Sequence, residues 1–257
     1  MRPLLATFPA ILICFLMLSS VLVLEHPTQT PMELDETDSN LIQFTSARAS
    51  SYSFIASGGS STQNIDAEHI EANPNGGWII GSEYNTTLTF GTHTLQPTSP
   101  YGGSGGPFGE FFLAVADNTG TWQSVFGADH SFGAGGLSFL TDVALDGNGE
   151  ILVTGYFYGE IGFTGSGGNP VAVISNTNTG YHWEGFLAKA DSMGNWLWAN
   201  SFTTQVNGSG EYSSTSVAQM DSAGDVFVSG EFQGETDFGG TALNVSSTQV
   251  YVTKFDG

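Results

Sequence analysis

Cysteine and basic residues are scarce in this sequence, and each scarcity excludes a class of protein. The only cysteine, Cys14, lies inside an apolar run, so the rest of the 257 residues has no disulfide and no thiolate nucleophile or metal ligand. Four Lys and Arg stand against 25 Asp and Glu, which gives a formal net charge of −21. This charge repels phosphate backbones, so nucleic acid is not an expected partner. It serves either solubility or cation binding, and composition does not separate the two.

Charged residues are absent from residues 3–24, a run of 22 residues rich in Leu, Ile, Phe and Val. The run is longer than the roughly 7 to 15 residues of a cleaved signal core and close to the roughly 20 that span a bilayer. We therefore predict that residues 1–24 form a hydrophobic helix, either a signal peptide or a signal anchor, with membrane anchoring through residues 3–24 in the second case. Arg2 precedes the run and acidic residues follow it, so both alternatives predict an extracellular or cell-surface body.

The segment 25–63 is rich in Ser, Thr, Pro and acidic residues and has no sustained apolar period, which predicts a spacer. From residue 64 to 257, short runs of Val, Ile, Phe, Tyr and Trp are broken by Gly, Asn, Asp and Ser, and no helical period occurs. The body is therefore predicted to be all-β.

This β-rich body repeats itself with a period near 74 residues. Gly81, Gly155 and Gly230 each follow an apolar run and lie 74 and 75 residues apart, while Trp122 and Trp196 lie 74 apart. A fixed period of this kind indicates a repeat architecture.

The period divides the body into copies at about 64–138 and 139–213, followed by an incomplete copy at 214–257. The last copy stops before the hairpin and strand that end the second one. Because a propeller needs about 4 to 8 blades, we expect the chain to be a fragment of a longer protein.

Two patterns in the second and third copies carry a resemblance to a known family. They are Asp-x-x-Gly-x-(Val/Ile)-x-Val-(Thr/Ser)-Gly-x-Phe-x-Gly and Phe-Leu-Ala-Lys-Ala-Asp-x-x-Gly-x-Trp-x-Trp, and they resemble the repeats of SBBP-type seven-bladed β-propeller proteins. The first copy departs from the second pattern, with Val115 and Ser124 in place of the Lys and the second Trp. The resemblance implies four-stranded blades around an axis, in extracellular or cell-envelope proteins without a common activity.

Turns and close backbone contacts are predicted at particular glycines. Asp146, Asp191 and Asp221 each begin an Asp-x-x-Gly segment between apolar runs, in which Asp caps a hairpin turn and Gly takes a positive φ. Gly155 and Gly230 directly follow apolar runs, which predicts a bulge or a strand end where another backbone comes close.

The first of these turns also has the alternating oxygen ligands of half a calcium loop. Asp146, Asn148 and Glu150 provide them, and Asp221 and Asp225 repeat the arrangement less completely. No acidic residue follows at the closing position, so an Asp–Gly turn is the favoured interpretation and Ca²⁺ the alternative. No other cofactor is predicted.

No catalytic constellation is identified. The histidines form no metal-binding motif and are predicted to be isolated loop or edge residues. They are His26, His69, His93, His130 and His182. A glycosidase needs only two suitably separated carboxylates, so this acidic sequence neither excludes one nor points to a pair.

Aromatic residues gather in two predicted loops. Tyr101 and Phe108 lie in a Gly-rich loop of the first copy, and Tyr181, His182 and Trp183 lie in the corresponding loop of the second. They are candidates for stacking on sugar rings, and the alternative is that they cover the edge of a blade.

These patterns favour a non-enzymatic, exported β-propeller scaffold that binds an as yet unknown protein or glycan. The alternatives are an extracellular carbohydrate-active enzyme and a purely structural adhesion repeat. Asn85, Asn207 and Asn244 match the N-glycosylation acceptor pattern, which fits an exported chain.

Overall fold

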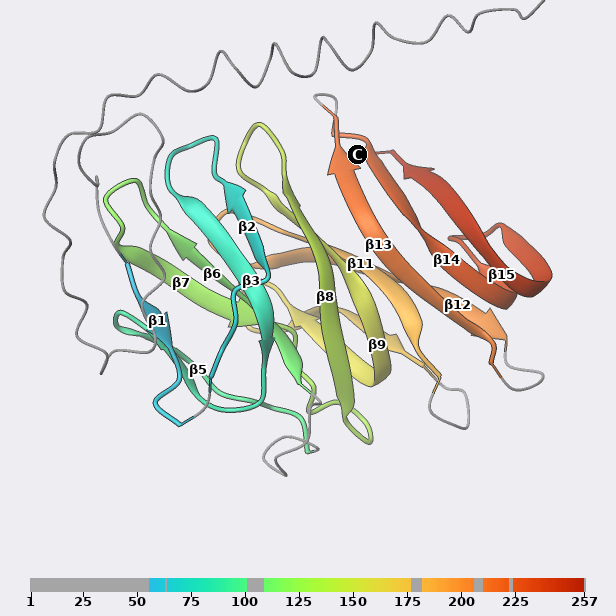
Figure 1. The fold of residues 1–257 in the computed structure, drawn as a ribbon, viewed down its shortest axis with the longest axis horizontal. Helices are drawn as coiled ribbons and strands as arrows, with labels where there is room; N and C mark the ends of the chain where they lie inside the picture. The colour runs from blue at the N-terminus through green and yellow to red at the C-terminus, as the bar shows by residue number, and fades with distance from the viewer. Residues whose placement is uncertain are drawn as a thin grey trace, which may run out of the picture. The chain divides into compact units, whose positions relative to one another are not determined.

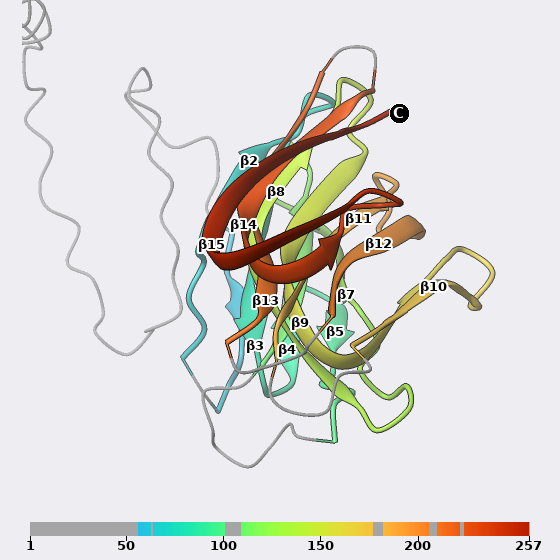
Figure 2. The same ribbon diagram turned by 90° about the vertical axis from the view of Figure 1, so that its right-hand side faces the viewer.

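The regular structure of the described residues is entirely β, as predicted for residues 64–257 (Figures 1 and 2). The computed structural model describes residues 56–62, 64–100, 109–176, 182–205, 210–221 and 224–256, and no helix occurs in these ranges. The chain divides into two compact units, 1–39 and 40–257, and all the described residues belong to the second.

The predicted hydrophobic helix of residues 1–24 lies outside the described residues. Within the part that is described, no helix has the length and apolar character needed to cross a membrane.

Fifteen strands make up the described part of the fold. In chain order they are β1 (Gly58–Gly59), β2 (His69–Ala72), β3 (Trp78–Tyr84), β4 (Leu88–Phe90), β5 (His93–Leu95), β6 (Glu110–Ala116), β7 (Trp122–Gly127), β8 (Gly136–Leu145), β9 (Ile151–Thr164), β10 (Pro170–Ser175), β11 (Glu184–Ala190), β12 (Trp196–Gln205), β13 (Tyr212–Met220), β14 (Val226–Asp237) and β15 (Ala242–Phe255).

These strands form three successive antiparallel meanders, which follow one another from left to right in Figure 1. The first sheet has the order β2-β3-β6-β7. The second sheet has the order β8-β9-β11-β12. The third sheet contains β13-β14-β15. Beside the first sheet, β1, β4 and β5 form a small sheet of their own. Strand β10 pairs with the C-terminal end of β9.

A short ladder joins the second and third sheets. Thr203–Gln205 of β12 pair with Glu235–Asp237 of β14, which creates a six-strand path from β10 to β13 within an eight-stranded sheet. Because β13 at the end of this path packs against β8 and β9, the sheet is partly closed.

The core lies between sheets because successive residues of a strand point to opposite faces. Between the first and second sheets, Ile79, Leu113 and Phe111 pack with Phe186 and Trp196. The indole N–H of Trp196 donates to the carbonyl of Gly127 in the first sheet, so this residue links the two sheets.

The opposite face of the second sheet packs against the third. Leu152 and Leu187 are fully buried there, in one cluster with Val226, Val228 and Phe232. Each strand of the second sheet therefore packs against the first sheet with one set of alternate residues and against the third sheet with the other set.

The outward face of the third sheet has no such cover among the described residues. Phe227 and Val252 occupy the positions of Leu152 and Leu187 in the register, yet they are 40% and 77% exposed. Val250, two residues earlier in β15, is 85% exposed. Figure 2 turns this sheet toward the viewer and shows β15 at the front.

The predicted close approaches and turns are confirmed. A Cβ at Gly155 would overlap the carbonyl oxygen of Phe139, and one at Gly230 would overlap that of Ser214. The turn glycines Gly149, Gly194 and Gly224 have φ of 81°, 91° and 90°.

The predicted spacer extends too far along the chain, because its last residues belong to the fold. Gly58 of β1 pairs with Phe90 of β4, and a side chain at Gly58 would overlap the Phe90 ring. The indole of Trp122 donates to the carbonyl of Ser57 at 2.9 Å. A strand of two glycines has no alternating apolar pattern, so β1 could not be predicted from the sequence. The predicted copy boundaries 138/139 and 213/214 fall within β8 and β13.

Candidate functional site

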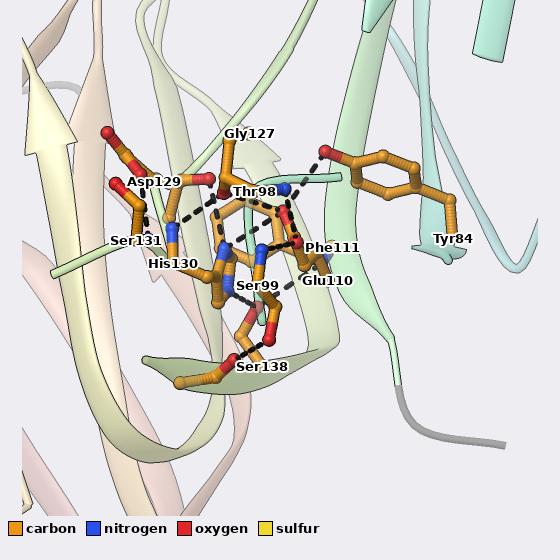
Figure 3. Close-up of polar contacts among 12 residues, drawn as sticks. Tyr84, Thr98, Ser99, Glu110, Phe111, Gly127, Asp129, His130, Ser131 and Ser138 are labelled. Carbon is orange, nitrogen blue, oxygen red and sulfur yellow. Dashed lines mark hydrogen bonds and ion pairs between the residues drawn. The ribbon is translucent and has the colours of Figure 1, made fainter. Parts of the chain in front are cut away.

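A buried Ser–His–Glu network lies where the first sheet meets the second (Figure 3). Ser138 Oγ lies 2.7 Å from His130 Nε2, and His130 Nδ1 lies 3.1 Å from Glu110 Oε2. Nucleophile, base and orienting carboxylate follow one another in this order in the catalytic triads of hydrolases. The arrangement is therefore the first candidate for an active site.

The elements around the network explain its geometry. Glu110 begins β6, His130 follows β7, and Ser138 lies in β8, so the three side chains link the first sheet to the second. The backbone N–H groups of Thr98 and Ser99 donate to Glu110 Oε1 at 2.7 and 2.5 Å.

Opposing effects act on the titration of Glu110. Burial acts to raise its pKa, but the hydrogen bond and charge of His130, together with the N–H donors of Ser99 and Thr98, lower the pKa below its usual 4.5. The Tyr84 hydroxyl donates to Glu110 Oε2 at 3.2 Å. Burial and the neighbouring Glu110 charge raise the pKa of Tyr84.

The network is closed to substrate within the part of the chain that the structure describes. Ser138 and His130 are fully buried, and Glu110 is almost so. Ser138 Oγ also accepts the N–H of Phe111 at 3.2 Å, so its hydroxyl is held by the neighbouring strand. Because a nucleophile must touch its substrate, the geometry in this form ties two sheets together and cannot perform acyl transfer.

The same carboxylate and serine recur at the next junction without a histidine. Glu184 begins β11, and Thr204, 74 residues after His130, donates its N–H to Glu184 Oε1 at 3.3 Å. Ser213 of β13 accepts the N–H of Gly185 at 3.0 Å and donates to the carbonyl of Phe202 at 2.6 Å. The recurrence supports a structural role for the Glu and Ser in joining consecutive sheets.

His130 corrects the prediction that every histidine is an isolated loop or edge residue. Its partners Glu110, Ser138 and Thr98 come from separate segments, so no local motif announces it. The 74-residue spacing of Glu110 and Glu184 was a usable signal for the carboxylate. No comparable signal existed for the histidine.

The predicted calcium ligands of the second sheet form a capped turn beside a lysine. Asp146 Oδ1 accepts the N–H groups of Asn148 and Glu150 at 2.9 and 2.8 Å, which is the favoured Asp–Gly turn. Lys189 Nζ lies 2.7 Å from Glu150 and 3.9 Å from Asp146, so an ammonium group balances these carboxylates. The Asn75 amide donates to the carbonyl of Asn148.

The third sheet repeats this arrangement. Asp221 Oδ1 accepts the N–H of Asp225 at 3.0 Å, and the Lys254 ammonium forms an ion pair with Asp225. Over the described ranges, no group of three or more His, Cys, Asp or Glu is placed to hold a metal ion. Calcium at these turns stays a prediction.

The predicted ligand loops are described only in part. Tyr101, Phe108 and Tyr181 lie outside the described residues. His182 Nδ1 lies 3.1 Å from the carbonyl oxygen of Glu211, which connects the loop to the third sheet.

Trp183 belongs to a cluster of four partly exposed aromatic rings, called the aromatic platform below. Its ring centroid lies 5.3 Å from those of Phe139 and Tyr156 and 6.1 Å from that of Tyr158, and Phe139 and Tyr156 stack at 5.0 Å. The sequence predicted Trp183 but missed the other three, because cross-strand pairing of β8 with β9 brings them together.

Two glutamate side chains raise the pKa of one residue of this platform. The pKa of Tyr156 is raised by burial and then by the charges of Glu83 and Glu68. Glu83 accepts the N–H of Leu140 at 2.7 Å. Burial raises the pKa of Glu83 and its hydrogen bond to Leu140 lowers it, while the neighbouring Glu68 contributes to a final value of about 7.

The predicted glycosylation sites differ in their surroundings. Asn85 is partly exposed just after β3, Asn244 is exposed in β15, and Asn207 lies outside the described residues.

Comparison with protein-family models finds no match to this chain, and comparison with curated proteins finds none either.

Proposed function

We propose that this protein is a non-enzymatic, exported or cell-surface scaffold of the β-propeller type that binds a glycan through its aromatic platform. The observation that carries the proposal is the gathering of Phe139, Tyr156, Tyr158 and Trp183 at a partly exposed position.

The propeller assignment rests on how the sheets follow one another. Three meanders pack face to face in chain order, and a buried Glu at the start of the third strand marks both the first and second sheets. Equivalent contacts at both junctions are what a radial repeat of blades requires. The resemblance to SBBP-type repeats supports the same architecture.

The glycan assignment rests on the chemistry of the platform. Aromatic faces offer a flat apolar surface to the C–H groups of sugar rings, and a Tyr hydroxyl adds a polar contact. Glu68 and Glu83 beside Tyr156 provide acceptors for sugar hydroxyl groups. Few precisely placed polar groups next to apolar rings are typical of small-molecule sites.

A glycan array followed by calorimetry tests this function. We expect Trp183→Ala to weaken binding at least tenfold, because it removes the ring common to three of the platform contacts. The control is Trp198→Ala, which removes a partly buried tryptophan that packs toward the third sheet. Equal losses in both variants, with both proteins folded, would contradict the site. No glycan binding at all would favour a protein partner or a purely structural adhesion role.

The raised pKa of Glu83 favours a second candidate, a carbohydrate-active enzyme. A carboxyl group with a pKa of about 7 beside a second carboxylate is suited to general acid catalysis near neutral pH. Release of reducing sugar from a polysaccharide panel, abolished by Glu83→Gln, would replace the scaffold proposal with this one.

A further inference from the structure

A pocket of about 280 Å³ lies between the turns of the first and second sheets, partly open to solvent. It is separate from the aromatic platform and shares no residue with it. Residues of both sheets line it, among them Asn73, Val115, Gln123, Ser124, Ser192 and Met193.

The pocket exists because two side chains of the first sheet are small. Val115 of β6 and Ser124 of β7 are paired across the strands. At the same register in the second sheet, Lys189 of β11 is paired with Trp198 of β12. The Trp198 ring packs against the core between the second and third sheets. A bulky ring thus lies at the second junction, where the first junction has a space.

Ser124 adds an unmet hydrogen bond to this space. Its Oγ is shielded from solvent and has no hydrogen-bond partner within the described ranges. A buried hydroxyl without a partner is unfavourable, and a ligand that supplies a donor or acceptor removes the penalty.

The polar lining favours a neutral ligand. Among the described residues, no basic side chain lines the pocket. The carboxylate in this lining, Asp117, already accepts hydrogen bonds from Thr119, Thr121 and Gln123, which close its own turn.

We infer that this pocket binds a small planar aromatic ring that carries one N–H or O–H group, such as an indole or a phenol. The ring takes the place that the Trp198 indole has in the second sheet, and its polar group pairs with Ser124 Oγ. The ring belongs either to a free small molecule or to a Trp or Tyr side chain of a partner, and the test separates these sources.

The test measures binding of 5-fluoroindole to the full chain by fluorine NMR, with N-acetyltryptophanamide as the probe for a side chain. Ser124→Trp copies the second sheet and fills the space, so we expect at least a tenfold loss of affinity. Ser124→Ala removes only the hydroxyl, and we expect a loss of roughly two- to tenfold. The control Leu197→Trp adds an indole at an exposed position of β12 outside the pocket, and we expect a change of less than twofold.

Each outcome decides the proposal. Binding of 5-fluoroindole alone assigns the pocket to a free aromatic compound, and binding of both probes assigns it to a side chain as well. Failure of both probes to bind overturns the inference, as does unchanged binding in a folded Ser124→Trp protein. If Ser124→Trp does not fold, an affinity unchanged by Ser124→Ala overturns the pairing with Ser124.

Discussion

Replacing Glu110 with glutamine keeps the shape of the side chain and removes the charge at the centre of the first junction. Oε1 retains the N–H donors of Thr98 and Ser99, but the group in place of Oε2 faces the Tyr84 hydroxyl, the Thr98 hydroxyl and His130. The hydroxyl groups can rotate and accept from the new amide. The contact with His130 no longer involves a carboxylate charge.

The expected magnitude follows from the hydrogen bonds that weaken. Hydrogen bonds to a charged group contribute about 1.5–3 kcal/mol each. Because the glutamine side chain keeps part of the network, we expect Glu110→Gln to lower the free energy of unfolding by about 2–4 kcal/mol at pH 7.

The effect must depend on pH in one direction. The folded pKa of Glu110 lies below the usual 4.5, so its charge stabilises the protein above the unfolded pKa, and this stability is lost as the pH falls through the folded pKa. Urea unfolding of wild type and variant at pH 7, 5, 4 and 3 should therefore show a difference that shrinks below pH 4.5. A difference under 1 kcal/mol at pH 7, or one independent of pH, would refute the reasoning.

Three further predictions test other parts of the structure. Gly155→Ala should lower the free energy of unfolding by at least about 2 kcal/mol, since the new Cβ overlaps the Phe139 carbonyl, whereas Gly147→Ala, which meets nothing within 4 Å, should change it by less than about 1 kcal/mol in thermal or urea melts. Glu83→Gln should stabilise the protein by about 1–2 kcal/mol at pH 8 and little at pH 4, because a folded pKa raised to about 7 means stability that is lost as the pH rises from 4.5 through 7; equal melting temperatures at pH 8 would contradict this. The double variant Val250→Lys and Val252→Lys should reduce self-association in analytical ultracentrifugation without lowering the melting temperature, because both side chains are exposed on β15; a large loss of stability would show that they pack.

Strands and turns could be predicted from residues that are close in sequence. The Asp146 turn was predictable because Asp caps its own backbone and Gly149 alone accepts the positive φ. Gly155 was predictable because a missing side chain after an apolar run indicates a close backbone, and the Phe139 carbonyl is there. Each inference needed only residues that are neighbours in sequence.

The candidate sites were harder to predict from the sequence because their residues are distant from one another along the chain. Trp183 stood out as a loop aromatic, but Phe139 lies 44 residues before it and joins it only through strand pairing. The pocket beside Ser124 depends on turns from two sheets, so its space appears only once the sheets are packed. The sequence showed that Ser124 stands where the second copy has a tryptophan, but it did not show that a pocket results.

The comparison of the two junctions separates structural from functional residues more sharply than triad geometry does. If Ser138, His130 and Glu110 were an active site, the serine and carboxylate would have no reason to recur as Ser213 and Glu184, where no histidine is present. Features shared by both junctions are explained by the need to join sheets. A ligand site is instead expected where the junctions differ. The clearest difference is that Ser124, whose hydroxyl has no partner among the described residues, stands where the second sheet has a large ring.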